Sequence, residues 1–142
     1  MKDIQILIAD DNQFVRRAIR AVLETAPDFR VVCEVEDGHE AVEKSKELHP
    51  QVVLLDVSMP RLGGFEAARQ IFAVAPTTEI ILLTEHAVAE MARTALGKGI
   101  RGYVIKSDAA KELADAIRAV IQQKVYVSAG LAVPEKEIQR PV

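Results

Sequence analysis

Five short segments, in which apolar residues follow one another and do not alternate with polar ones, most constrain the fold of this 142-residue chain. They lie near residues 4–9, 31–35, 52–57, 79–83 and 101–105, separated by longer stretches with helical periodicity. Continuous apolar runs are typical of strands buried on both faces, and their alternation with helices is typical of a parallel sheet with helices on each side. We therefore predict an α/β fold with a doubly wound, five-stranded parallel sheet.

The stretches between the runs carry helix start and stop signals. Asn12 precedes an amphipathic segment that ends before Pro27, and further helices are predicted at about 38–48, 64–74 and 88–96. The fifth helix has an apolar stripe formed by Leu113, Ile117, Val120 and Ile121. After about residue 124 the pattern fades. We expect one domain over residues 1–124 and an extension or linker over 125–142.

Composition excludes several classes of function. The net charge is -3 without a basic cluster, so we expect no nucleic-acid binding by this chain alone. The single cysteine, Cys33, cannot form an internal disulfide and is expected to be a small core residue. No secretory signal and no run long enough to span a bilayer is evident, so we expect a cytoplasmic protein without a membrane role.

Polar residues follow or end four of the apolar runs. Asp10 and Asp11 follow the first run, Asp56 ends the third, Thr84 follows the fourth and Lys106 follows the fifth. The carboxyl ends of parallel strands face the crevice in which such sheets bind ligands. We therefore expect three acids, a hydroxyl and an ammonium to gather at one edge.

The three acids at this edge predict a cation site. Unscreened like charges about 4 Å apart repel by roughly 4 kcal/mol at an effective dielectric of 20, so the cluster should bind a cation or hold a proton. Oxygen ligands favour Mg2+ over Zn2+, and His39, His49 and His86 show no zinc-like spacing. Each residue alone also has an ordinary structural explanation, such as helix capping by an acid or a surface position for Lys106. Only the combination is specific.

The combination resembles the receiver domain of two-component response regulators over about residues 3–124. The similar stretches are Asp10-Asp11, Leu54-Leu55-Asp56-Val57-Ser58-Met59-Pro60, Leu83-Thr84 and Tyr103-Val104-Ile105-Lys106. Residues 102–108 and Val125-Tyr126-Val127-Ser128 are similar to the NarL/FixJ-like subfamily. The resemblance implies a flavodoxin-like sheet with strand order 2-1-3-4-5 and five helices.

The resemblance also implies a chemistry for these residues. Asp56 would accept a phosphoryl group from a phosphohistidine of a sensor histidine kinase, and Lys106 would pair with a phosphoryl oxygen. Mg2+ would be held by Asp11, Asp56 and the backbone carbonyl of Ser58, with Asp10 acting through water. The chain would be a phosphoacceptor that assists its own Mg-dependent phosphorylation and dephosphorylation, not an enzyme in the usual sense.

A conformational switch and partners are implied in the same way. The Thr84 hydroxyl would move to bond the phosphoryl group, and Tyr103 would swing inward. If the chain is a fragment of a transcription regulator, its output would be transcription control through a helix-turn-helix domain not in this chain. A stand-alone receiver is the alternative that the sequence leaves open. A homodimer through the first or fifth helix is a further expectation.

Three positions depart from the usual receiver pattern. Ser58 stands where many receivers have a larger polar side chain, and we expect this difference to change the lifetime of the acyl phosphate. Ser107 follows Lys106 where many receivers have a cis proline, and a cis bond here would cost about 3 kcal/mol or more. Glu85 follows Thr84, where a small residue is usual. We hypothesise that Glu85 slows phosphorylation or limits access, the alternative being a solvated side chain.

Two other functions are compatible with parts of the pattern. A haloacid-dehalogenase-like phosphatase would also use a strand-end aspartate, but would need a second acid two residues later, where this chain has Ser58. A binding module that keeps the fold without the chemistry would not need three mutually repelling acids.

Overall fold

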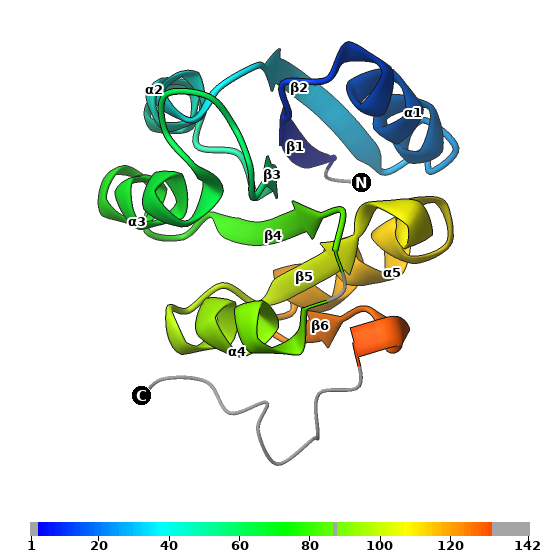
Figure 1. The fold of residues 1–142 in the computed structure, drawn as a ribbon. Coiled ribbons are helices and arrows are strands. Elements are labelled where there is room, and N and C mark those ends of the chain that lie inside the picture. Colours follow the sequence, from blue (N-terminus) through cyan, green and yellow to red (C-terminus); the bar gives the residue numbers. More distant parts are fainter. Residues whose placement is uncertain (1–2, 87, 132–142) are drawn as a thin grey trace.

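The computed structural model describes residues 3–86 and 88–131, which form a parallel sheet between two layers of helices (Figure 1). The strands of this part of the chain are β1 Ile4–Ala9, β2 Phe29–Val35, β3 Val52–Asp56, β4 Glu79–Thr84, β5 Gly102–Ile105 and β6 Tyr126–Val127. Their order is β2-β1-β3-β4-β5-β6, and every neighbouring pair is parallel. The predicted α/β class and the order 2-1-3-4-5 are confirmed.

The α-helices of the described residues are α1 Gln13–Leu23, α2 Gly38–Leu48, α3 Gly64–Val74, α4 Ala89–Gly97 and α5 Ala109–Ile121. The three interior helices lie within one residue of their predicted bounds. The side chain of Asn12 caps α1 by accepting from the amides of Phe14 and Val15. None of the described helices has both the length and the apolar character needed to cross a bilayer.

The sheet has an apolar core on each face, as continuous runs predict. In Figure 1, α2, α3 and α4 cover one face, and α1 and α5 cover the other. Successive strand residues alternate between the two cores, so Leu7 and Val53 face the first core while Ile6 and Leu54 face the second. Cys33 is half-buried against the first core, as expected for a small packing residue.

The sixth strand, β6, corrects the expectation of five strands. Its residues pair with β5 in the register Gly102 to Tyr126 and Tyr103 to Val127. A run of two paired residues is too short to stand out in the sequence. A 3-10 turn, η2 (Ala129–Leu131), follows it. The proposed domain boundary at residue 124 stays a prediction, and residues 132–142 of the expected extension lie outside the described residues.

Candidate functional site

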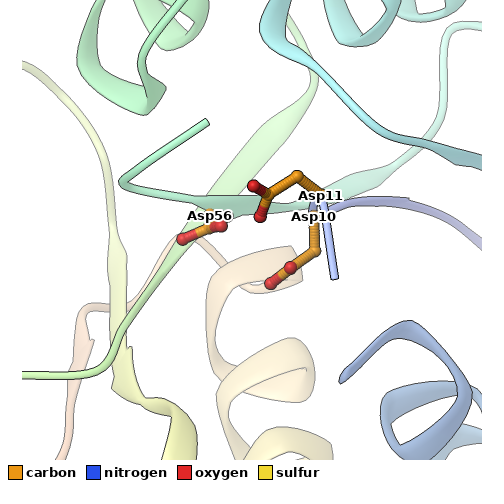
Figure 2. Close-up of side chains that lie close together, drawn as sticks. All are labelled: Asp10, Asp11 and Asp56. Carbon is orange, nitrogen blue, oxygen red and sulfur yellow. The ribbon is translucent and has the colours of Figure 1, made fainter. Parts of the chain in front are cut away.

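Three carboxylates meet where β1 and β3 end. Asp10 and Asp11 directly follow β1, and Asp56 is the last residue of β3. Figure 2 shows their side chains gathered together, and one oxygen from each lies within 4.8 Å of those from the other two. Asp10 and Asp56 are buried, whereas Asp11 is exposed. The structure therefore brings together the acids that the strand-end pattern placed at one edge.

Lys106 supplies positive charge to this cluster. It follows β5 directly, and its Nζ lies 2.8 Å from Asp10 Oδ2 and 3.1 Å from Asp56 Oδ1. The backbone N–H of Ser58 also donates to Asp56 Oδ1, at 3.1 Å. Within the described part of the chain, Asp11 forms no ion pair. One ammonium thus faces three acids, and the cluster keeps an excess of negative charge.

This charge balance shifts the pKa values of two groups. Burial, reinforced by the negative charge of Asp10, raises the pKa of Asp56 to about 6, although Lys106 and the Ser58 N–H oppose the change. Burial works to lower the pKa of Lys106, but the carboxylates of Asp10 and Asp56 outweigh it and raise that pKa above its usual value. Asp56 therefore holds a proton more tightly than an ordinary aspartate, and Lys106 stays charged.

The chain at Asp10 is fixed by backbone and side-chain contacts. The Asp10 amide donates to Val35 O, and Asp10 Oδ1 accepts from the Asn12 amide at 2.8 Å. The Asp10 carbonyl accepts from Arg16 Nη1 at 2.6 Å. Arg16 is nearly buried and forms an ion pair with Glu34 on β2. Sequence reasoning missed Arg16, because no residue pattern marks a contact to a backbone carbonyl.

Gly64 brings α3 close to the end of β3. A Cβ at this position would lie 2.5 Å from the carbonyl oxygen of Asp56 and 2.9 Å from the Cα of Val57, so a side chain cannot fit. The Gly64 amide donates to Val57 O at 2.9 Å. This close approach fixes the path of the backbone at Ser58, beside the acids.

Thr84 ends β4 and has Tyr103 of β5 as a neighbour, and among the described residues neither side chain forms a hydrogen bond with the three acids. The Thr84 hydroxyl donates to the carbonyl oxygen of His86 and accepts from its amide. Tyr103 is fully buried in the first core, and its hydroxyl oxygen lacks a well-formed hydrogen bond among the described residues. Burial raises the pKa of Tyr103, an effect that the neighbouring Thr84 hydroxyl opposes. The tyrosine is therefore already in the inward position.

An open cleft of about 430 Å³ lies above the acids. It is lined by Asp11, Asn12, Asp56, Val57, Ser58, Thr84, Glu85, His86 and Lys106. Glu85 is exposed at this cleft. The Lys106–Ser107 bond is trans, like all peptide bonds of the described residues, and the chain continues directly into the 3-10 turn η1 (Lys106–Asp108). The cleft therefore opens onto Asp56 and its partner Lys106.

The donor set fits a hard divalent cation. The clustered ligand atoms are all carboxylate oxygens, and the exposed Asp11 leaves room for water in the coordination shell. Mg2+ is typically bound in this way, by one or two carboxylates together with water and phosphate oxygens. The cluster contains neither histidine nor cysteine, which structural zinc sites use.

Comparison with known proteins agrees with this geometry. A family model described as the response regulator receiver domain matches residues 6–118. The uncharacterized transcriptional regulatory protein YxjL of Bacillus subtilis (strain 168) is 39% identical over 116 residues, which are 82% of this chain and 53% of that protein. The response regulator UvrY of Escherichia coli (strain K12) is 36% identical over 129 residues, which are 91% of this chain and 59% of that protein.

A solved structure is similar over nearly the whole chain. The crystal structure of a two-component response regulator of the LuxR family from Aurantimonas sp. SI85-9A1 has a TM-score of 0.87 and 33% sequence identity. The match covers 96% of each chain. By contrast, this chain spans little more than half the length of the curated relatives it matches.

Proposed function

This chain belongs to the response regulator receiver domain family, and on that premise we propose that Asp56 accepts a phosphoryl group from a phosphohistidine of a sensor histidine kinase. Receiver domains of this family are signalling proteins, not enzymes in the usual sense. The observation that carries the proposal is the Lys106 ammonium 3.1 Å from Asp56 Oδ1, inside an open acidic cleft. A carboxylate can be the nucleophile in phosphoryl transfer, and an ammonium beside it can neutralise charge on the phosphoryl oxygens.

The contacts of Asp56 suggest how the transfer proceeds. Oδ1 carries the contacts to Lys106 and Ser58, so among the described residues Oδ2 is the oxygen left for attack. A P–O bond forms to Asp56 as the P–N bond to histidine breaks, and the histidine nitrogen leaves with that bonding pair. Lys106 pairs with a phosphoryl oxygen. Positioning and charge neutralisation supply most of the catalysis, because the transition state is loose.

The acids divide into two roles in this proposal. Asp11, Asp56 and the backbone carbonyl of Ser58 would hold Mg2+, and Asp10 would act through water. When bound, Mg2+ neutralises charge that develops on the phosphoryl oxygens. Asp10 has a further role that its contacts support, since its buried Oδ2 lies 2.8 Å from Lys106 Nζ and orients that ammonium.

Thr84 is the residue that moves in the proposed switch. Its hydroxyl leaves the backbone of His86 to bond the phosphoryl group, whereas Tyr103 already lies inward. The phosphoryl group biases a pre-existing equilibrium by the difference in its interaction with the two states. Moving that equilibrium from 1:99 to 99:1 requires about 5.5 kcal/mol.

The output of the switch lies elsewhere in the whole protein. The relatives are about twice as long as the matched region, and their names describe transcriptional regulators and response regulators. We therefore assign transcription control to a helix-turn-helix domain outside residues 1–142, with residues from 125 leading toward it. DNA binding belongs to that domain, since this chain has a net charge of -3. Receiver dimerisation and a cytoplasmic location complete the proposal.

A titration with beryllofluoride and Mg2+, followed by NMR, tests this function. We expect saturable shifts of the Asp56, Thr84 and Lys106 amide resonances, and none in Asp56→Asn. An inert module would show no shift in the wild type. A phosphatase would turn over a phosphomonoester, which we expect this protein not to do, because the position two residues after Asp56 is Ser58, a residue without an acidic side chain.

A further inference from the structure

Ser128 joins the end of β6 to the strand that carries the switch tyrosine. It is 2% exposed, although the sequence pattern placed it in a linker. Its backbone N–H donates to the carbonyl oxygen of Tyr103 at 2.9 Å, and its hydroxyl accepts from the amide of Ile105 at 2.9 Å. One buried serine therefore contacts both the switch residue and the residue that precedes Lys106.

Glu112, in the first turn of α5, fixes the orientation of this hydroxyl. Its Oε1 accepts the Ser128 hydroxyl proton, and its Oε2 accepts from the amide of Ala129 at 3.2 Å. A serine hydroxyl has one proton to donate. With that proton committed to Glu112, a lone pair of Oγ faces the Ile105 amide.

The rest of the η2 turn packs against the same strand. Leu131 is 4% exposed and belongs to the apolar cluster that also contains Tyr103 and Ile105. Its amide donates to the carbonyl oxygen of Ser128 at 3.0 Å. Residues 128–131 are therefore held to the end of β5 by polar and apolar contacts together.

We propose that Ser128 is a positioning residue for Lys106, and that it couples the state of the phosphorylation site to the chain that follows β6. The inference rests on the proposed function of Asp56. β5 has β4 on one side and only the two-residue strand β6 on the other, so Ser128 supplies the last hydrogen bond on that side before Lys106. A shift of Lys106 is transmitted through the hydrogen bond between the Ile105 amide and the Ser128 hydroxyl to residues 128–131.

The test compares Ser128→Ala with a matched loss of a buried hydroxyl elsewhere. Thr78 is 3% exposed, and its hydroxyl donates to the carbonyl oxygen of Pro50 at 2.7 Å, at the opposite end of the sheet. Thr78→Val therefore controls for a general loss of stability. The two measurements are the rate of Asp56 phosphorylation by acetyl phosphate with Mg2+, and hydrogen exchange of the Ile105 amide without phosphodonor.

Ser128→Ala should slow phosphorylation by about fivefold, the loss expected from one buried hydrogen bond, and speed Ile105 exchange. Thr78→Val should change neither. Ser128→Thr keeps the hydroxyl and should restore most of the rate. Glu112→Gln keeps one side-chain oxygen that can accept a hydrogen bond, so it should slow phosphorylation less than Ser128→Ala does. It is the second variant in case Ser128→Ala does not fold. In the wild type, phosphorylation should alter exchange at residues 126–131.

Equal rates and equal Ile105 exchange in Ser128→Ala and Thr78→Val would overturn the inference while leaving the proposed function intact. An unchanged rate in Glu112→Gln together with unchanged exchange at residues 126–131 would overturn it as well. A wild type that takes up no phosphoryl group would instead overturn the proposed function, and this inference with it.

Discussion

Lys106 Nζ lies 3.1 Å from Asp56 Oδ1 and so pairs with the carboxylate that is proposed to be phosphorylated. The same ammonium also contacts Asp10, which is fully buried. Because burial and Asp10 still raise the pKa of Asp56 to about 6, this pairing is insufficient to neutralise the cluster. The three carboxylates therefore repel one another until a further positive charge binds.

Asp56→Asn should stabilise the metal-free protein in a pH-dependent way. The pKa of Asp56 is raised from 3.8 to about 6 in the folded state, so ionising Asp56 lowers the free energy of unfolding as pH rises from about 4 to about 6. Above pH 6 the full penalty, up to about 3 kcal/mol, is present in wild type and absent in Asp56→Asn. Urea unfolding in EDTA at pH 4 and pH 7 measures the difference. A gain of equal size at both pH values would contradict the raised pKa.

Lys106→Gln should separate metal binding from phosphoryl transfer. Removing the ammonium leaves the acids uncompensated, so Mg2+ should bind about tenfold more tightly in calorimetry. Phosphorylation should slow by about 100-fold or more, because a charged group that stabilises the transition state is lost. Lys111→Gln, at an exposed position on α5, is the control and should change neither quantity. If Lys106→Gln bound Mg2+ more weakly than the wild type, the three carboxylates would not carry the excess negative charge described above.

Arg16→Gln should weaken Mg2+ binding, because the Asp10 carbonyl loses the guanidinium that holds it at 2.6 Å. Arg20→Gln is the matched control: Arg20 lies one turn further along α1, pairs with the same Glu34 and carries the same charge, but has no contact with Asp10 in the described structure. We expect about tenfold weaker binding for Arg16→Gln relative to Arg20→Gln, because a hydrogen bond from a charged group contributes about 1.5 kcal/mol or more. Equal affinities would mean that only the charge of Arg16 matters.

Glu85→Ala should speed phosphorylation by a small phosphodonor. Glu85 is exposed and lines the cleft that the anionic donor must enter, so its removal lowers like-charge repulsion by a solvent-screened amount, about twofold to fivefold in rate. Glu90→Ala, at an exposed acid in the first turn of α4, controls for net charge. A rate equal to wild type would show that the Glu85 side chain is simply solvated.

The sheet and the acid cluster could be predicted from the sequence, because each follows from a pattern of neighbouring residues that only one arrangement of strands and helices satisfies. Continuous apolar runs such as Val52-Val53-Leu54-Leu55 have no exposed face, which requires helices on both sides. Parallel strands then bring their carboxyl ends to one edge, where Asp10 and Asp56 had to meet.

The contacts of Arg16 and Ser128 could not be predicted in this way. Their partners are backbone atoms, the Asp10 carbonyl and the Ile105 amide, which every residue type offers. The strand β6 was also missed, because its two paired residues become a strand only through pairing with β5. The inward position of Tyr103 depends on the packing of the first core, which no local pattern specifies.

The most direct test of the central claim is the mass of the intact protein after incubation with acetyl phosphate and Mg2+. We expect the wild type to gain one phosphoryl group and Asp56→Asn to gain none. Addition of EDTA before the phosphodonor should also prevent the gain. A phosphoryl group on Asp56→Asn, or none on the wild type, would contradict the assignment of Asp56 as the phosphoacceptor.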